Sequence, residues 1–270
     1  MTSAPGQSAR LRTITSPQNA LLKDLRKAFA KSEPVEGYFA VEGFKLIEEA
    51  IRSGAKLKAV VFSESGAQRA DRLLPQLSAH TEAVGVSDKL FASLVETETP
   101  QGVAALVSVK HHELDTLLVE DALLVVAVGL QDPGNLGTII RSAEAFGAAG
   151  VVLGEKTVSR FNAKAVRASA GSAFRVPLVN ESTEKLIPRL REKNIRMLAT
   201  SSHKGDPIDQ AQLTGGVALF IGNEGAGLPR EVMAQMDGLV TIPQSEKVES
   251  LNAGIATSIL LYEAARQRRG

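Results

Sequence analysis

The stretch Asp132-Pro133-Gly134-Asn135-Leu136-Gly137-Thr138-Ile139-Ile140-Arg141 decides the fold class of this chain. The apolar run 123–128 before it reads as a buried strand, and the residues after it read as a helix with Asn135 as the expected N-cap. An amide and a guanidinium therefore stand six residues apart at a strand-to-helix junction, where α/β sheets build active sites. Taken alone, the stretch also fits an ordinary turn with a capping Asn and a solvated Arg.

Two further polar segments follow apolar runs in the same half of the chain. Residues 221–229 contain three glycines together with Asn223 and Glu224, directly after the apolar run 217–220. Residues 242–252 lead into the apolar helix predicted for residues 253–265. Structural explanations stay open here, because Glu224 is also suited to a first helical turn, Ser250 to a helix cap and Asn252 to a polar first-turn position.

In this order, the three segments resemble the three motifs of the SpoU/TrmH family of ribose 2′-O-methyltransferases, in the SPOUT superfamily. The resemblance covers roughly residues 120–268 and implies a deep C-terminal trefoil knot that binds S-adenosylmethionine in a bent shape, mainly through backbone groups. By position, the implied catalytic residues are Asn135, Arg141, Glu224, Ser250 and Asn252. The implied cofactor-binding residues are Thr200, Ser201, Gly222, Asn223, Gly227, Ile242, Pro243 and Leu251. Core packing is the alternative for Ile242 and Leu251.

The implied reaction needs an oxygen nucleophile in line with a methyl donor and an acceptor for the hydroxyl proton. A protonated ribose 2′-hydroxyl is a poor nucleophile, so positioning supplies much of the rate. The resemblance assigns activation of the hydroxyl to Arg141, but a guanidinium stays protonated at neutral pH and is a weak base. We therefore favour electrostatic stabilisation of the developing alkoxide, with action as a base as the alternative.

The chain divides near residue 115 into two α/β parts, 1–115 and 116–270. In the first part we expect a helix opened by Ser16 as cap and Pro17, strands at 38–41, 57–62 and 102–109, and helices at 44–52 and 87–96. Residues 38–50 resemble the substrate-binding domain of the same family, which is similar to ribosomal protein L30e and implies RNA recognition. The alternative is a connecting strand and helix with solvated Glu residues.

The second part alternates strands with helices, which predicts a largely parallel sheet. The expected strands lie near 123–128, 150–153, 176–179, 195–199, 217–221 and 239–242. The fold class is therefore α/β, with a small L30e-like domain followed by a SPOUT catalytic domain.

The amino-acid composition limits where the protein can contact RNA. Lys and Arg number 31 against 30 Asp and Glu, so RNA contact must come from local basic patches rather than a uniformly basic surface. Residues 1–31 and 156–175 supply two such patches, and a solvated helix face is the alternative for each. The expected RNA-binding residues are Lys23, Lys27, Arg160, Lys164 and Arg167.

The absence of cysteine and the scattered histidines predict no metal site, and no apolar run reaches the roughly 18 residues of a membrane span. We expect a cytoplasmic protein whose residues 1–10, rich in Ser, Thr, Gly and Pro, are disordered. The L30e-like domain favours ribosomal over transfer RNA as the substrate.

The resemblance also implies a homodimer in which the partner helps to build the site. Ile255, Ile259, Leu260 and Leu261 of the last helix are candidates for the interface or for the core. Two other functions stay open at this point. One is a catalytically silent RNA-binding or ribosome-assembly protein. The other is a dinucleotide-dependent enzyme, although the turn at 134–137 lacks the G-x-G-x-x-G pattern.

Overall fold

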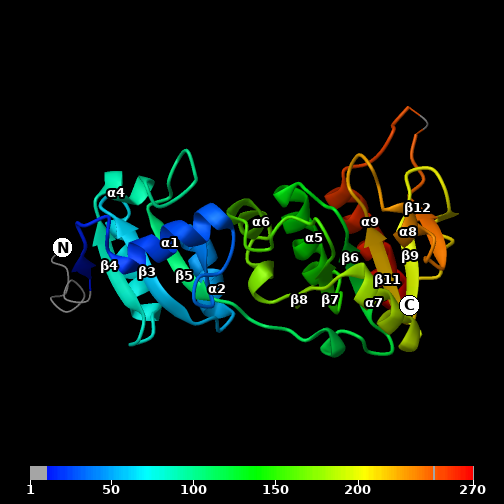
Figure 1. The fold of residues 1–270 in the computed structure, drawn as a ribbon, viewed down its shortest axis with the longest axis horizontal. Coiled ribbons are helices and arrows are strands. Elements are labelled where there is room, and N and C mark those ends of the chain that lie inside the picture. The colour runs from blue at the N-terminus through cyan, green and yellow to red at the C-terminus, as the bar shows by residue number, and fades with distance from the viewer. Residues whose placement is uncertain (1–10, 246, 270) are drawn as a thin grey trace. The chain divides into compact units, whose positions relative to one another are not determined.

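The computed structural model describes residues 11–245 and 247–269, so the expectation of disorder for residues 1–10 lies outside it. The described chain forms two compact units (Figure 1). The first contains the residues up to Lys110 together with Phe161–Arg167, and the second contains His111–Arg160 and the residues from Ala168 onward.

The first unit is built on a five-stranded mixed sheet in the order β1-β4-β3-β5-β2. Its β1–β4 and β4–β3 pairs are parallel, whereas β3–β5 and β5–β2 are antiparallel. The strands are β1 (Arg12–Thr13), β2 (Tyr38–Glu42), β3 (Leu57–Ser63), β4 (Glu82–Val86) and β5 (Val103–Ser108). The helices are α1 (Ala20–Lys31), α2 (Phe44–Arg52), α3 (Ala70–Leu73) and α4 (Asp88–Ala92).

Several details of this unit differ from the sequence predictions, including the short elements β1 and α3, which the sequence did not indicate. Helix α1 is capped by Asn19, whose side chain accepts a hydrogen bond from the Leu21 N–H at 3.0 Å, so Ser16 is not its cap. Helix α4 ends at Ala92 and is much shorter than the predicted helix at 87–96. Strand β4 was not predicted, because Gly85 interrupts its apolar pattern. In the structure, Leu11 lies 3.3 Å from the place that a Gly85 Cβ would occupy.

The second unit is built on a seven-stranded sheet in the order β10-β12-β9-β11-β6-β7-β8. The strands are β6 (Leu123–Ala127), β7 (Gly150–Leu153), β8 (Leu178–Asn180), β9 (Arg196–Thr200), β10 (Asp206–Pro207), β11 (Val217–Ile221) and β12 (Gly238–Thr241). The helices are α5 (Pro133–Ala145), α6 (Ala163–Ala168, mostly grouped with the first unit), α7 (Thr183–Glu192), α8 (Arg230–Met233) and α9 (Ala253–Arg269). Every strand pair is parallel, which confirms the predicted largely parallel sheet. The strands therefore all end at one edge.

Helices cover both faces of this sheet. Leu124 and Val126 of β6 pack in one apolar cluster with Leu186 and Leu190 of α7. Because side chains alternate along a strand, the neighbouring β6 residues face the opposite side of the sheet. All of β6 is buried, as expected for a central parallel strand with an unbroken apolar sequence.

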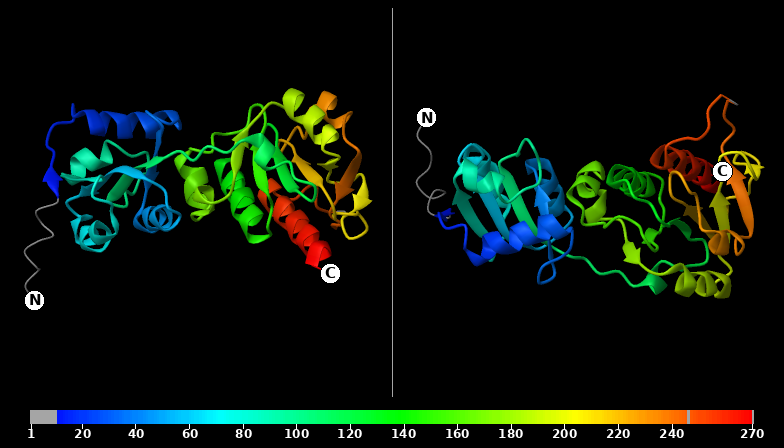
Figure 2. Two further views of the ribbon diagram at one scale, coloured as in Figure 1. Left: turned by 90° about the horizontal axis from the view of Figure 1, so that it is seen from below. Right: turned by 45° about the horizontal axis from the view of Figure 1, so that its top comes forward.

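Helices α5 and α9 run side by side (Figures 1 and 2). The Ser142 and Ser258 hydroxyls lie 2.7 Å apart, and a Cβ on Gly254 would lie 3.0 Å from the Cβ of Thr138. Residues 138 and 142 of one helix thus meet residues 254 and 258 of the other, so the two helices run parallel. The turn before α5 and the turn before α9 are consequently neighbours.

An ion pair joins α5 to the segment before β8. The Arg175 guanidinium contacts both oxygens of Glu144, with Nη2 to Oε2 at 3.0 Å, and this hydrogen bonding lowers the pKa of Glu144. A carboxyl group whose pKa is lowered by folding stabilises the folded protein at pH values above the usual carboxyl pKa. That stabilisation is lost as the pH falls through the lowered pKa. Because both side chains are about one-third exposed, we expect Glu144→Gln to reduce the free energy of unfolding by only about 0.5 kcal/mol at pH 7.

Urea unfolding of this variant at pH 7 and at progressively lower pH checks that expectation. The difference from the unchanged protein should shrink as the pH falls below the usual carboxyl pKa of about 4.3. The exposed Glu184 of α7 provides a matched control through Glu184→Gln. A pH-independent loss of stability would instead assign the effect to packing of the Glu144 side chain.

Candidate active site

Asn135 lies in the first turn of α5, at the carboxyl edge of the parallel sheet. The cap of this helix is Asp132, whose carboxylate accepts the Asn135 N–H at 2.8 Å, and Pro133 occupies the first helical position. The prediction of Asn135 as the N-cap is therefore wrong. Because Asp132 acts as the cap, the Asn135 side-chain amide is left to make other bonds, and Asn135 is buried, with 7% exposure.

The buried amide links three predicted catalytic residues. Its Nδ2 donates to Glu224 Oε1 at 2.9 Å, and its Oδ1 accepts from Asn252 Nδ2 at 2.8 Å. Asn252 Oδ1 in turn accepts the N–H of Ile255 at 3.2 Å, so Asn252 caps α9 and the proposal of Ser250 as that cap is wrong. The network runs across three segments that are far apart in the sequence, and the parallel packing of α5 and α9 brings two of them together.

Asn223 shapes the loop after β11. Its Oδ1 accepts the N–H groups of Gly225 and Ala226, each at 3.0 Å, and its Nδ2 donates to the Gly129 carbonyl at 3.0 Å. The loop closes through an antiparallel bridge between Asn223 and Gly227. A Cβ on Gly222 would lie 2.3 Å from the Gly227 carbonyl carbon, so only glycine permits this closure. The Asn223 side chain is thus bonded within the protein.

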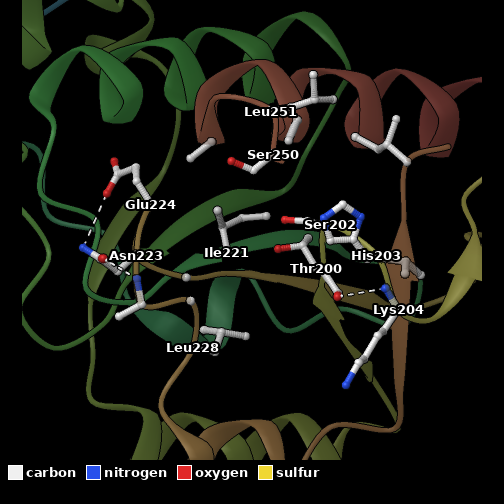
Figure 3. Close-up of a pocket in the computed structure, with 18 of the residues that line it drawn as sticks. Thr200, Ser202, His203, Lys204, Ile221, Asn223, Glu224, Leu228, Ser250 and Leu251 are labelled. Carbon is white, nitrogen blue, oxygen red and sulfur yellow. Dashed lines mark hydrogen bonds between the residues drawn. The ribbon is translucent and has the colours of Figure 1, made fainter. Parts of the chain in front are cut away.

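A cavity of about 410 Å³ opens beside this loop (Figure 3). Seven of the eight predicted cofactor-binding residues line it, namely Thr200, Ser201, Gly222, Asn223, Gly227, Ile242 and Leu251. Pro243 does not line it, although its neighbours on both sides do. Apolar side chains form much of the remaining wall, including Ile221, Leu228, Val240 and Leu260.

The predicted catalytic residues take different places relative to this cavity. Glu224 and Ser250 line it, while Asn135 and Asn252 reach it through their hydrogen bonds to one another and to Glu224. Arg141 does not line the cavity and lies exposed on α5. Within one chain, the structure therefore brings together four of the five residues and leaves the guanidinium apart from them.

Sequence reasoning missed the residues 202–204 and Gln244, which also line the cavity. The signal was present, because a polar run ending in Gly205 follows the strand predicted at 195–199. The same pattern of a polar, glycine-containing segment after an apolar strand led to the other motifs.

The predicted RNA-binding residues are distributed over both units. Lys23 and Lys27 are exposed on α1, Lys164 is exposed on α6, and Arg167 is half-buried. Arg160 instead donates from its guanidinium to the Leu178 carbonyl, and burial lowers its pKa. The assignment of Arg160 to RNA contact stays a prediction.

Two statements hold for residues 11–245 and 247–269, one on metal ligands and one on membrane spans. No group of three or more His, Asp or Glu residues there has the arrangement of a metal site. None of the described helices is long and apolar enough to cross a membrane.

A parallel sheet with a small-molecule cavity and an amide-carboxylate network at the carboxyl ends of its strands defines an α/β ligand-binding domain. Residues 122–262 match the model of the SpoU rRNA Methylase family, and residues 21–105 match that of the MRM3-like substrate binding domain. The chain belongs to the SpoU rRNA Methylase family. This assignment removes the alternative of a dinucleotide-dependent enzyme.

Individual relatives resemble the chain over most of its length. The 23S rRNA (guanosine(2553)-2′-O)-methyltransferase RlmP of Bacillus subtilis is 33% identical over 93% of this chain and 98% of its own. The 23S rRNA (guanosine-2′-O-)-methyltransferase RlmB of Yersinia pestis is 34% identical over 74% of this chain and 86% of its own. The SpoU methyltransferase AviRb from Streptomyces viridochromogenes, solved in complex with the cofactor AdoMet, superposes with a TM-score of 0.82 at 30% identity, covering 94% of this chain and 99% of its own.

Proposed function

We propose that this protein transfers a methyl group from S-adenosylmethionine to a ribose 2′-hydroxyl of ribosomal RNA. The observation that carries the proposal is the hydrogen-bonded set of Asn135, Glu224 and Asn252 beside the cavity, in a member of the SpoU family. Relatives that match along most of the chain are named as 2′-O-methyltransferases of 23S rRNA. The trefoil knot implied by the family motifs stays a prediction.

The cavity fits the cofactor in size and in chemistry. Its volume of about 410 Å³ falls within the range of small-molecule sites, and apolar side chains such as Ile221, Val240 and Leu260 suit an adenine ring. Gly222 and Gly227 expose backbone groups to the cavity, as the expected backbone recognition requires. When bound, S-adenosylmethionine supplies an electrophilic methyl group on a positively charged sulfur.

The residues around the cavity then have two tasks, to hold the acceptor ribose in line and to stabilise its oxygen. Glu224 lines the cavity and is fixed by Asn135, so it is placed to accept a hydrogen bond from a ribose hydroxyl. The Arg141 guanidinium binds the neighbouring phosphate and stabilises the alkoxide that develops on the 2′-oxygen. Solvent or a phosphate oxygen takes the proton, because a guanidinium is a weak base.

We also propose a homodimer in which Arg141 of one protomer serves the cavity of its partner. Ile255, Ile259 and Tyr262 of α9 are 52%, 37% and 51% exposed and recur at helical spacing, so they form one apolar stripe. Arg141 is exposed on the adjacent α5 and does not line the cavity of its own chain. A second copy packed on this face buries the apolar stripe and gives the guanidinium a site to act on.

The first unit is proposed to recognise the RNA substrate, because residues 21–105 match a substrate-binding domain. Exposed Lys23 and Lys27 on α1 are the proposed phosphate contacts in this unit. Ribosomal RNA is favoured over transfer RNA by the names of the relatives. The cytoplasmic location stays a prediction.

Transfer of labelled methyl groups to unmodified transcripts of ribosomal and transfer RNA tests the proposed function. We expect label in ribosomal RNA only, in dinucleotides that resist alkaline hydrolysis because their 2′-oxygen is methylated. Label in transfer RNA alone would correct the substrate. Binding of both S-adenosylmethionine and RNA without transfer, on naked RNA and on ribosomal subunits, would favour the catalytically silent alternative.

A further inference from the structure

The segment after β9 forms a turn that is fixed at the edge of the cavity. The Ser201 N–H donates to the Val240 carbonyl at 3.0 Å, and the Lys204 N–H donates to the Ser201 hydroxyl at 3.1 Å. The Ser202 carbonyl accepts from the Gln244 side chain at 3.2 Å. Gly205, with φ of +104°, packs against the backbone of Leu239, where a Cβ would lie 2.4 Å from the carbonyl group. The backbone of this turn is therefore held in place by β12 and the loop after it.

This turn supplies all the basic side chains among the described residues that line the cavity, His203 and Lys204. Glu224 supplies the corresponding carboxylate. Figure 3 shows Glu224 on one side of the cavity, and His203 and Lys204 on the other. The acidic and basic side chains that line the cavity therefore lie on opposite sides of it, with Glu224 at the hydrogen-bonded network and the basic residues at the turn.

The cofactor has a matching distribution of charge. S-adenosylmethionine carries a sulfonium and an ammonium group, and its single negative group is the carboxylate of the amino-acid end. Its methyl group must face the ribose, which the proposed function places beside Glu224. A carboxylate next to Glu224 would be repelled, whereas at the opposite side it meets a lysine ammonium.

We propose that Lys204 binds the carboxylate of S-adenosylmethionine and so selects the complete amino-acid end of the cofactor. The inference rests on the proposed function, because it assumes that this cavity holds the cofactor. The fixed backbone of the turn limits the conformational entropy lost on binding to that of the lysine side chain. An RNA phosphate is the competing anion for Lys204, and the experiment separates the two.

The test compares the dissociation constants of S-adenosylmethionine and decarboxylated S-adenosylmethionine, which lacks only the carboxylate. We expect the unchanged protein to bind the complete cofactor more tightly, and Lys204→Met to weaken that binding roughly three- to tenfold, as for a charge-assisted bond at an exposed site. The variant should bind the decarboxylated compound as the unchanged protein does. Lys204→Arg, which keeps the charge, should retain most of the discrimination, and Lys185→Met on α7 is the matched surface control.

The possible outcomes distinguish the inference from the function on which it rests. If the unchanged protein binds neither compound, the proposed function fails. If it binds S-adenosylmethionine but Lys204→Met leaves the discrimination intact, the inference alone is overturned. A raised KM for RNA in Lys204→Met, with both cofactor dissociation constants unchanged, would overturn it in favour of a phosphate contact.

Discussion

Replacing Arg141 with alanine is expected to lower the rate of methyl transfer by about 10²–10³-fold, the usual cost of removing one group that stabilises developing negative charge. The affinity for S-adenosylmethionine should stay within about twofold, because the proposed contacts of Arg141 are with the RNA phosphate and the 2′-oxygen and not with the cofactor. Stability should also change little, since the side chain is exposed on α5. Single-turnover rates and cofactor titrations measure both quantities.

Two further variants sharpen this expectation. Arg141→Lys keeps the charge but loses the planar fork that binds a phosphate through two bonds, so an intermediate rate is expected. Arg191→Ala is a matched control, because that arginine is exposed on α7 and donates to the Gln235 carbonyl. A rate for Arg141→Ala close to that of Arg191→Ala would refute the proposed role.

Mixing two inactive variants asks whether Arg141 serves the partner's cavity. Consider a dimer of one Arg141→Ala chain and one Asn135→Asp chain. If each site combines Asn135 of one chain with Arg141 of the other, one site is intact and the other carries both substitutions. Random exchange of subunits then restores about a quarter of the original activity, because half the dimers are mixed and each has one good site. If both residues serve their own chain's cavity, every site keeps a lesion and no activity returns.

The strand ends and the residues near them were the part of this protein most open to prediction from sequence. Apolar runs identified the six longer strands of the second unit, and a parallel sheet necessarily gathers their carboxyl ends at one edge. That geometry explains why Glu224 after β11 and Asn135 after β6 meet, although 89 positions separate them. Motif order then linked them to the segment before α9.

The errors at the candidate site concern choices between neighbouring polar residues. Asp132 and Asn135 are both suitable N-caps, as are Ser250 and Asn252, and residue type alone does not show which side chain faces the free N–H groups. Arg160 was similarly ambiguous. Its charge predicted RNA contact, which stays a prediction, and its guanidinium donates to the Leu178 carbonyl within the fold. Such outcomes depend on tertiary packing that periodicity does not describe.

Asn135→Asp is the second change with a large expected effect. It places a carboxylate where Asn135 Nδ2 now donates to Glu224 Oε1 at 2.9 Å, so a hydrogen bond becomes a repulsion between two negative groups. Glu224 is exposed and water screens part of this repulsion, so we expect a loss of about 1–3 kcal/mol in the free energy of unfolding at pH 7. Chemical denaturation at pH 7 measures this.

The double variant Asn135→Asp, Glu224→Gln reverses the polarity of the bond without changing the net charge. The glutamine amide can donate to the new carboxylate, and Asn252 Nδ2 still has an acceptor at position 135. We therefore expect stability to return to within about 0.5 kcal/mol of the unchanged protein, with a matching coupling energy in the mutant cycle. The methyl-transfer rate should recover less than the stability. Position 224 lines the cavity, and the double variant no longer presents a negative charge to the substrate there. If the stability does not recover, the proposed energetic role of the Asn135–Glu224 hydrogen bond is contradicted. If the rate recovers fully, the negative charge of Glu224 is not needed for methyl transfer and Glu224 only positions other groups.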